Sequence, residues 1–354
     1  MRRTMKSFKK VIVMLLSLAM ILSMVACGTK DTQQPENPTD TNEETSGVDI
    51  VKNEIPFLTI AASDSGGEWY TMSVAINTIL EDKLGIATSV GPGGGQANIY
   101  AVQNGEAQFG WSNTATLSTA VAGDAPFDDG VDYGDLRMVL SAHPGPITFV
   151  TLKGSDITSL SQIQDKNIAL GPTGAMSNTV ALALLEEEYG ITEESVAKAG
   201  GTISYLAYAE GGDALKDGDV DIWITQGPYP ASWLKEIDMN PGIAFVQVEE
   251  DHLNSFLSKH TNWVSIDVPA GSYSSLDTDY TTIGSWNIIL CNASLSEESV
   301  YQIVKALWED IQVVWDASAT ATRFMDPKHP ANGLGTLQLH PGAEKYYKEI
   351  GAEY

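Results

Sequence analysis

Short β-rich runs alternate with helical patterns along most of the chain, and this alternation is the strongest constraint on its fold. Residues 58–62 are apolar and β-branched and predict a strand, whereas residues 69–84 repeat apolar side chains at helical spacing. Further strands are expected at 87–90, 108–112, 137–142, 147–152, 167–170, 203–208, 221–225 and 243–248, and further helices at 97–103 and 178–189. Strands that alternate with helices are typical of mostly parallel sheets, so the predicted fold class is α/β.

The sequence also repeats one local layout. Residues 101–111 and 214–223 each contain a helix end, a glycine suited to a left-handed C-cap, and an apolar strand that ends near a tryptophan. Two similar lobes would explain this repeat. A long amphipathic helix is expected to begin after Ser296, a favourable N-cap, and to run to about Trp315.

The first 54 residues differ in character from the rest. Residues 1–10 carry five basic residues and no acid, and residues 11–26 are almost wholly apolar, as in an export signal. The four residues that end at Cys27 resemble a bacterial lipobox, which implies cleavage before Cys27 and lipid attachment to its thiol; an ordinary secretory peptide is the alternative. Residues 28–54 are polar and acidic, and they are predicted to form a disordered tether.

Charge and cysteine content exclude several classes of protein. The chain has 354 residues and a formal net charge of -26, which would repel a phosphate backbone, so nucleic-acid binding is not expected. Once the leader is removed, Cys291 and the proposed lipid-bearing Cys27 are the two cysteines left. We therefore expect a fold held by packing, with Cys291 as a buried, inert thiol.

Three strand-to-helix junctions have the same glycine-rich construction. They lie at 63–67, 91–95 and 171–177, each after the carboxyl end of an expected strand. In open α/β sheets this edge binds ligands, because helix N-termini there present unpaired N–H groups. Tight connections without a function are the alternative for any one loop. The three together predict a ligand site.

Motifs for catalysis are not supported by their context. Residues 64–67 read Asp-Ser-Gly-Gly, as in serine proteases, but the histidine needed upstream is missing because the first histidine is His143. The five histidines lack metalloprotease spacing, and the acidic run at 217–221 has Ile222 where a calcium loop needs glycine. We therefore predict neither an enzyme nor a metal or other cofactor.

A set of short motifs occurs in a characteristic order between Phe57 and the C-terminus. The motifs are Ser65-Gly66-Gly67-Glu68-Trp69-Tyr70, Gly93-Gly94-Gly95-Gln96-Ala97-Asn98, Gly105-Glu106-Ala107-Gln108-Phe109-Gly110, Leu136-Arg137, Gly171-Pro172-Thr173-Gly174, Gly218-Asp219-Val220-Asp221 and His340-Pro341-Gly342-Ala343-Glu344. In order and spacing this set resembles the TAXI family of TRAP-transporter solute receptors. The chain departs from the family pattern at Trp69-Tyr70, Gln108 and Ala175-Met176-Ser177.

The resemblance implies a two-lobed periplasmic-binding-protein fold of type II, in which each lobe is a mostly parallel sheet flanked by helices and two crossing strands form the hinge. The expected lobes are residues 55–144 with 268–354, and residues 145–267. Such a receptor would capture a small carboxylate or amino acid, glutamate-like in character, by lobe closure and deliver it to a TRAP permease by sodium-coupled uptake. We expect a monomer that is anchored as a lipoprotein to the outer face of the bacterial cell membrane. A sensory lipoprotein on the same scaffold is the alternative.

The junctions and the strand ends beside them supply the predicted ligand contacts. From the first lobe these are Ser63, Ser65, Gly66, Gly67, Trp69, Gly94, Gly95, Asn98, Trp111 and Asn113, and from the second Thr173, Gly174, Ser177, Gln226, Gly227 and Tyr229. Core packing is the alternative for each aromatic residue. Asp64 or Glu68 is placed to pair with the ammonium of an amino acid. Arg137 is expected to be structural or to reach a ligand carboxylate, and His340 to be a cap or packing residue.

Overall fold

The structure is a computed structural model that describes residues 47–65 and 67–354. The described residues belong to one compact unit. The predicted leader, the lipidation site Cys27, the tether up to residue 46 and the site residue Gly66 lie outside the described residues. The prediction of disorder up to residue 54 is wrong for residues 47–54, which form a helix whose Val51 is buried in the first-lobe core. Within the described part of the chain, no helix has both the length and the apolar character needed to cross a membrane.

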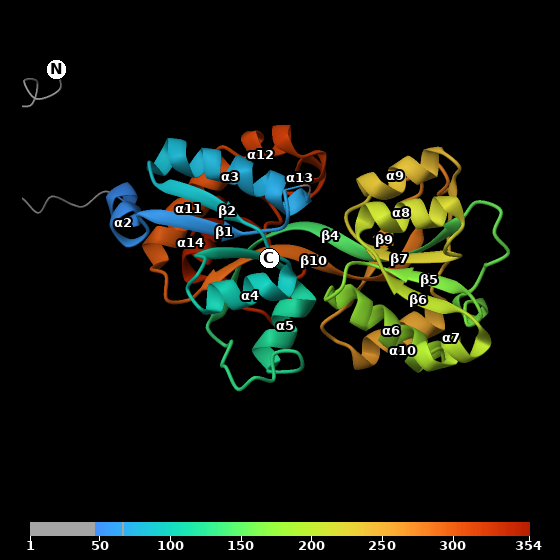
Figure 1. The fold of residues 1–354 in the computed structure, drawn as a ribbon. Coiled ribbons are helices and arrows are strands. Elements are labelled where there is room, and N and C mark those ends of the chain that lie inside the picture. The colour runs from blue at the N-terminus through green and yellow to red at the C-terminus, as the bar shows by residue number, and fades with distance from the viewer. Residues whose placement is uncertain (1–46, 66) are drawn as a thin grey trace, which may run out of the picture. The chain divides into compact units, whose positions relative to one another are not determined.

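The first lobe begins with the predicted alternation of strands and helices (Figure 1). Its elements are α2 (Gly47–Glu54), β1 (Phe57–Ala61), α3 (Glu68–Leu84), β2 (Ala87–Gly91), α4 (Gly95–Gln103), β3 (Phe109–Asn113) and α5 (Thr114–Ala122). Strand β1 pairs in parallel with both β2 and β3. The strand and helix positions expected from residues 58–112 are therefore confirmed within a few residues.

The second lobe repeats this arrangement. Its elements are a 3-10 turn (Leu160–Gln162), β5 (Asn167–Leu170), α6 (Met176–Tyr189), α7 (Glu193–Ala199), β6 (Thr202–Tyr205), α8 (Tyr208–Asp217), β7 (Ile222–Gln226), α9 (Ser232–Met239), β8 (Ile243–Phe245), α10 (Glu250–Lys259) and β9 (Val264–Val268). Strand β5 pairs in parallel with β6 and β7. The repeat seen in the sequence thus corresponds to two similar lobes.

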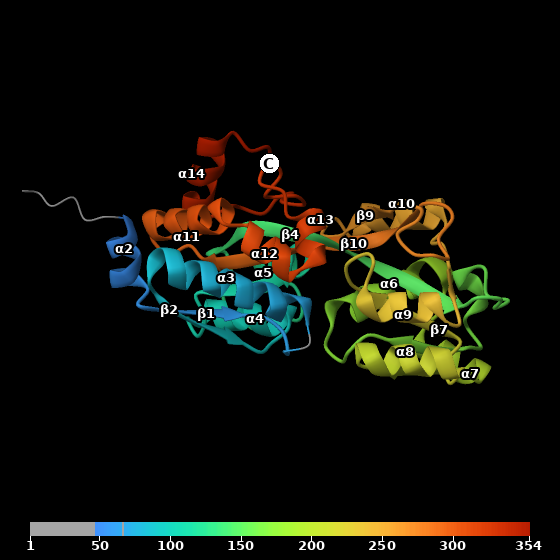
Figure 2. The same ribbon diagram turned by 90° about the horizontal axis from the view of Figure 1, so that it is seen from above.

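Two long strands, β4 (Leu136–Leu152) and β10 (Tyr280–Asn292), pair antiparallel and run from one lobe to the other (Figure 2). The sequence predicted strands at 137–142 and 147–152, with the first continuing past His143-Pro144 into the second, and the single strand β4 confirms this. Strand β10 was not predicted. The strand order is β2-β1-β3-β10-β4 in the first lobe and β6-β5-β7-β4-β8 in the second. Each lobe therefore inserts one crossing strand at the same place, and the predicted two-lobed type II fold is confirmed.

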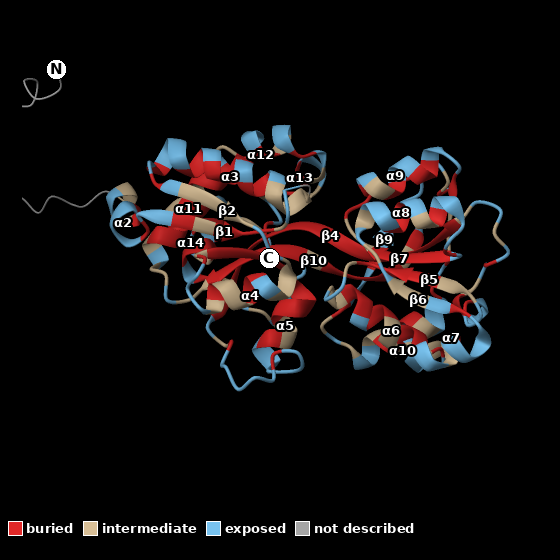
Figure 3. Cartoon of the chain, in the orientation of Figure 1, coloured by how far each residue is buried: buried red, intermediate tan, exposed pale blue. Residues whose placement is uncertain are grey.

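Side-chain packing places the second division between the lobes later than expected. Ile266, Tyr273 and Tyr280 are buried in one cluster with Trp223 and Leu234 of the second lobe. Residues 268–283, assigned to the first lobe from the sequence, thus pack with the second. We place this boundary near Gly284, where β10 passes between the lobes. Figure 3 shows that β4 and β10 are buried along most of their length.

The C-terminal region completes the first lobe with α11 (Glu297–Glu309), α12 (Gln312–Ala317), α13 (Ala319–Phe324) and α14 (Pro341–Ile350). The Ser296 hydroxyl accepts a hydrogen bond from the Ser299 amide, so the predicted N-cap is confirmed. The single long helix expected up to Trp315 is instead broken between α11 and α12. Cys291 is fully buried in the first-lobe core, and burial raises the pKa of its thiol.

Candidate ligand-binding site

Strand register brings the carboxyl ends of both sheets to the crossing strands. Asn113, the last residue of β3, pairs with Asn287 of β10, which in turn pairs with His143 of β4. In the other lobe Gln226, the last residue of β7, pairs with Ile147 of β4. Ile147 is four positions after His143, so the two strand ends lie about 13 Å apart along β4. Ligands of α/β proteins bind at such edges.

A row of polar groups covers this crossover. Residues directly opposite in antiparallel pairs share a face of the sheet, so Asn113, Asn287 and His143 lie on one face. The Gln226 side chain donates from Nε2 to the Gly145 carbonyl at 2.8 Å. A Cβ atom on Gly145 would lie 2.8 Å from Asn287 Nδ2 and 3.4 Å from Gln226 Nε2. The absence of a side chain at Gly145 therefore leaves room for the side-chain amides of Asn287 and Gln226 on either side of this residue.

His143 is the ionisable residue of this row, and only 2% of its surface is exposed. Its Nδ1 atom lies 2.9 Å from the Pro144 carbonyl oxygen and 3.3 Å from Asn287 Nδ2. Its Nε2 atom is buried and has no hydrogen-bond partner among the residues that the structure describes. Burial lowers the pKa of His143, while the Pro144 carbonyl and the nearby Glu68 charge act in the opposite direction. The ring is therefore neutral at pH 7.

The loop after β1 is folded around Ser63. The Ser63 hydroxyl accepts a hydrogen bond from the Tyr70 amide at 3.2 Å, which satisfies one N–H group at the start of α3. A Cβ atom on Gly67 would lie 2.2 Å from Ser63 Oγ, so this turn requires glycine. Ser65 is exposed at the tip of the loop.

The loop after β2 leaves open space beside the crossover. Helix α4 begins after Gly94, where an added Cβ atom would meet nothing within 4 Å. At Gly95 an added Cβ atom would lie 3.8 Å from both the Trp69 ring and Asn113 Nδ2. Predicted site residues from all three first-lobe strand ends are thus gathered in one place.

Two predicted ligand contacts of the first lobe, Trp111 and Asn98, use their polar groups in hydrogen bonds within the protein. Trp111 is fully buried, its indole N–H donates to Ser73 Oγ at 2.8 Å, and Trp69 stacks on it at 5.8 Å between ring centroids. Asn98 is 1% exposed and donates from Nδ2 to the carbonyls of Ala62 and Trp111, at 2.7 and 2.8 Å. For Trp111 the packing alternative is therefore the better one, and Asn98 supports the site indirectly.

Asn113 has both a structural role and a place in the polar row. It is the N-cap of α5, and its Oδ1 atom accepts hydrogen bonds from the Thr116 amide and hydroxyl at 2.8 and 3.0 Å. Its Nδ2 atom faces Gly95. The neighbouring Thr114 hydroxyl accepts from the Trp286 amide of β10 at 3.2 Å, which ties this strand end to the crossover.

The loop after β5 resembles its counterpart in the first lobe. Thr173 and Gly174 are exposed, Gly174 has a φ of 81°, and Ser177 lies buried in the first turn of α6. Asn178 donates from Nδ2 to the carbonyls of Gly171 and Pro172, at 3.1 and 2.8 Å. Asn178 thus stabilises this loop by donating to backbone carbonyls, as Asn98 does in the first lobe.

The loop after β7 joins the two lobes through Tyr229. A Cβ atom on Gly227 would lie 2.3 Å from the Trp233 ring, so Gly227 serves packing. Tyr229 is 9% exposed and packs edge-on against Phe324 of α13, with 4.9 Å between ring centroids. Arg323 donates to the Tyr229 carbonyl at 3.0 Å and lies 5.0 Å from the centre of its ring. Sequence reasoning had assigned Arg323 no role.

Arg137, for which a structural role and a ligand contact were both left open, and His340 bond to the backbone. Arg137 donates from Nη1 to the carbonyls of Gly134 and Leu136. His340 is the N-cap of α14: its Nδ1 atom accepts from the Gly342 amide at 3.2 Å. The expected capping role of His340 is confirmed.

A comparison with protein-family models matches residues 60–351 to the NMT1-like family. The chain belongs to the NMT1-like family. Solved structures similar to this NMT1-like protein include a TctC solute-binding protein from Polaromonas (13% identity, TM-score 0.48, covering 83% of this chain and 98% of that one). The aliphatic sulphonate-binding protein SsuA from Escherichia coli has 15% identity and a TM-score of 0.45, covering 83% and 82%. An amino acid ABC transporter substrate-binding protein from Streptococcus pneumoniae has 14% identity and a TM-score of 0.43, covering 78% and 98%.

The match to the NMT1-like family extends over both lobes and both crossing strands of this protein. The main group missed from its sequence is the His143 and Asn287 pair on the crossing strands. The local signal for His143 was its position between two expected strands, before Pro144. Nothing local links it to Asn287, which lies 144 residues further along the chain.

Proposed function

We propose that this NMT1-like protein binds one small polar solute at the crossover and delivers it to a membrane transporter. One observation supports this most strongly: loops from both lobes end beside a polar row that contains a buried acceptor, His143 Nε2, with no partner among residues 47–65 and 67–354. Buried polar atoms are nearly always hydrogen-bonded, so an exception at the crossover needs an explanation. A bound solute would supply the missing partner.

The helix ends at this edge suit a carboxylate on that solute. Helices α3, α4, α6 and α9 begin after Gly67, Gly94, Ala175 and Ala231, whose side chains cannot accept hydrogen bonds from the first turn. Helices α11, α13 and α14 are capped instead by Ser296, Ser318 and His340. Uncapped N-termini carry N–H groups and a partial positive charge that favour an anion.

The proposed solute contacts are most of those predicted from the sequence, together with groups at the crossover. The proposed contacts are Ser63, Ser65, Gly66, Gly67, Trp69, Gly94, Gly95, Asn113, Thr173, Gly174, Ser177 and Gln226, together with Glu68, His143 and Asn287. Asn98, Trp111, Gly227 and Tyr229 support these contacts through packing and hydrogen bonds. The solute class is a small carboxylate or amino acid.

The transporter is proposed to be of the TRAP type. This rests on the ordered motifs that resemble TAXI receptors, a narrower group than the family matched. A lipid on Cys27 would hold the receptor at the outer face of the membrane, near its permease. Metabolic labelling with a fatty acid tests the anchor: the natural chain should incorporate label, and Cys27→Ala should release unlabelled protein.

Calorimetry tests the binding function directly. The exported chain is titrated with L-glutamate, L-glutamine, 2-oxoglutarate and succinate. We expect heat from at least one of these solutes and none after Gly95→Val, which would place side-chain atoms near Trp69 and Asn113. No heat from any of the four would contradict the proposed solute class.

Small-angle scattering tests lobe closure. Saturation with the solute that gives heat should lower the radius of gyration, because the lobes would approach each other about β4 and β10. An unchanged radius at saturation would contradict closure while leaving binding intact.

A further inference from the structure

The hydrogen bonds of His143 determine which of its nitrogens carries the proton. Two acceptors do not attract each other, so the 2.9 Å contact between Nδ1 and the Pro144 carbonyl oxygen, the shortest polar contact of this ring, favours a proton on Nδ1. Asn287 Nδ2 lies 3.3 Å from His143 Nδ1, which is a longer contact, and it donates a hydrogen bond to the His143 carbonyl. In the neutral ring, a proton on Nδ1 leaves a lone pair on Nε2.

Nε2 is therefore a buried acceptor without a donor among the described residues. His143 is 2% exposed and pairs across the sheet with Asn287, in the row where strand ends of both lobes meet. A polar atom left in this way costs stability, and an apolar residue of similar shape would avoid that cost. A hydrogen-bond donor on a bound solute would satisfy His143 Nε2 and would explain why a histidine occupies this position.

Glu68 adds a negative charge to the same region. It is the first residue of α3, its carboxylate accepts a hydrogen bond from the Ser318 hydroxyl, and its charge acts on His143. No Lys, Arg or His side chain in the described part of the chain forms an ion pair with Glu68. The Glu68 carboxylate thus has a hydroxyl donor in Ser318 but no ion-pair partner in the described chain, and His143 Nε2 has no donor there at all.

We propose that His143 Nε2 and Glu68 together receive the N–H groups of an ammonium group on the bound solute. This rests on the proposed function and deepens it: the carboxylate of the solute lies at the uncapped helix ends, and its ammonium lies at the crossover. The site then selects an amino acid over the oxoacid of the same shape. A dicarboxylate would place negative charge against Glu68 and against a lone pair.

Matched pairs of solutes test this selectivity. Glutamate with 2-oxoglutarate, alanine with pyruvate, and leucine with 4-methyl-2-oxopentanoate each differ in the amine alone. For the pair that binds, we expect the amino acid to bind about tenfold or more tightly than the oxoacid. Equal binding, or tighter binding of the oxoacid, would overturn the inference and leave the proposed function standing. No binding by any of the six would count against the proposed solute class, and the inference would fall with it.

Three variants locate the selectivity. Glu68→Gln keeps the acceptor for Ser318 and removes the charge, so the preference for the amino acid should shrink severalfold. His143→Leu should weaken the amino acid more than the oxoacid. Glu106→Gln, at an exposed glutamate, is the matched control and should leave both affinities unchanged. A thermal unfolding midpoint recorded for each variant separates lost binding from lost folding.

Nuclear magnetic resonance of the histidine nitrogens tests the tautomer independently. In the solute-free protein, the His143 signals, assigned by their loss in His143→Leu, should show a protonated Nδ1 and an unprotonated Nε2. Addition of the amino acid should shift Nε2 without protonating it. A proton on Nε2 in either state would overturn the inference whatever the affinities.

Discussion

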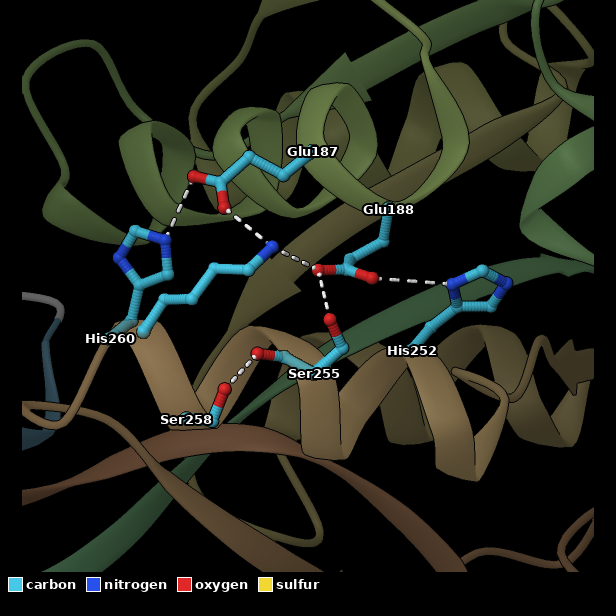
Figure 4. A network of polar contacts seen from close by, with 7 residues as sticks. Glu187, Glu188, His252, Ser255, Ser258 and His260 are labelled. Carbon is cyan, nitrogen blue, oxygen red and sulfur yellow. Dashed lines mark hydrogen bonds and ion pairs between the residues drawn. The ribbon is translucent and has the colours of Figure 1, made fainter.

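Two regions of the molecule combine histidines with glutamates, and they differ in how completely their polar atoms are paired. One is the crossover row of His143, Asn287 and Gln226 with the nearby Glu68. The other lies between α6 and α10 in the second lobe (Figure 4). There Glu188 accepts hydrogen bonds from Ser255 and Lys259, both at 2.9 Å, and lies 3.4 Å from His252 Nδ1. Glu187 in turn contacts Lys259 and His260.

The difference separates a structural network from a candidate site. In the network between α6 and α10, the two carboxylates face hydrogen-bond donors from the neighbouring helix, so the residues hold two helices together without any ligand. At the crossover, His143 Nε2 is buried and unpaired in the described chain. The type of residue is therefore a poor guide to function, whereas the pairing of its atoms is informative.

The largest expected effect comes from adding a side chain at Gly145, in the crossover. Gly145→Val should destabilise the protein by about 1–3 kcal/mol, because its Cβ atom would stand 2.8 Å from Asn287 Nδ2. Solute binding should also be lost, since the amides of Asn287 and Gln226 would be displaced. Urea unfolding and calorimetry measure the two effects. Gly94→Ala is the stability control, because an added Cβ atom there meets open space; unchanged binding in Gly145→Val would contradict the location of the site.

Breaking the paired network should affect stability alone. Glu188→Ala removes the acceptor for Ser255 and Lys259, and its side chain is only 7% exposed. We expect a loss of about 1 kcal/mol or more in the free energy of unfolding. The dissociation constant of the solute should stay the same. A weaker affinity in Glu188→Ala would mean that the two regions are not separate in function.

Replacing the unpaired histidine should have the opposite pattern. His143→Leu substitutes an apolar side chain for one whose buried Nε2 has no partner within the described residues, so the free energy of unfolding should change by less than about 1 kcal/mol or rise. The affinity for the solute should fall. Denaturant unfolding without solute checks the first effect. A loss of stability larger than that of Glu188→Ala would show that His143 is structural.

The two regions should also lose stability in different pH ranges, and this is the smallest expected effect. Burial lowers the pKa of folded His143 below its ordinary 6.5, so the unfolded chain binds more protons as the pH falls below 6.5, and stability decreases there. The Lys259 ammonium lowers the pKa of Glu188 below its ordinary 4.5, so stability from that network is lost only at lower pH.

Unfolding measured without solute at pH 7, 5.5 and 4 separates these two contributions. His143→Leu should reduce the slope between pH 7 and 5.5, and His340, whose pKa burial also lowers, should account for part of the remaining slope. Glu188→Gln should leave that slope unchanged. An unchanged slope in His143→Leu would contradict the neutral, buried histidine.

The sequence allowed much of the fold to be predicted, because the alternation of strand and helix is a local pattern. β1, α3, β5 and α6 all lie where apolar spacing placed them. β10 was missed, although Cys291 within it was expected to be buried, because its pairing depends on strands far away in the chain. The helix expected from Ser296 to Trp315 was too long, since apolar spacing alone did not reveal the break after Glu309.

The candidate site was predictable only in part. The glycine-rich junctions follow strand ends, and this order in the chain was enough to place them at one edge of the sheet. The roles of Asn98 and Trp111 depend on carbonyl and hydroxyl partners that the spacing of residues does not reveal. The role of His143 depends on Asn287, which contacts it only through tertiary structure, so no pattern around residue 143 could have identified it.

Hydrogen exchange with and without solute tests the central claim most directly, because it reports on both regions in one experiment. With saturating L-glutamate or another amino acid shown to bind, amide exchange should slow in the loops at 63–67, 91–95, 171–177 and 226–231 and along the crossover at 143–147. Exchange in the facing parts of α6 and α10 around Glu188 and Ser255 should not change. Slower exchange confined to α6 and α10, with the four loops unaffected, would contradict a binding site at the crossover.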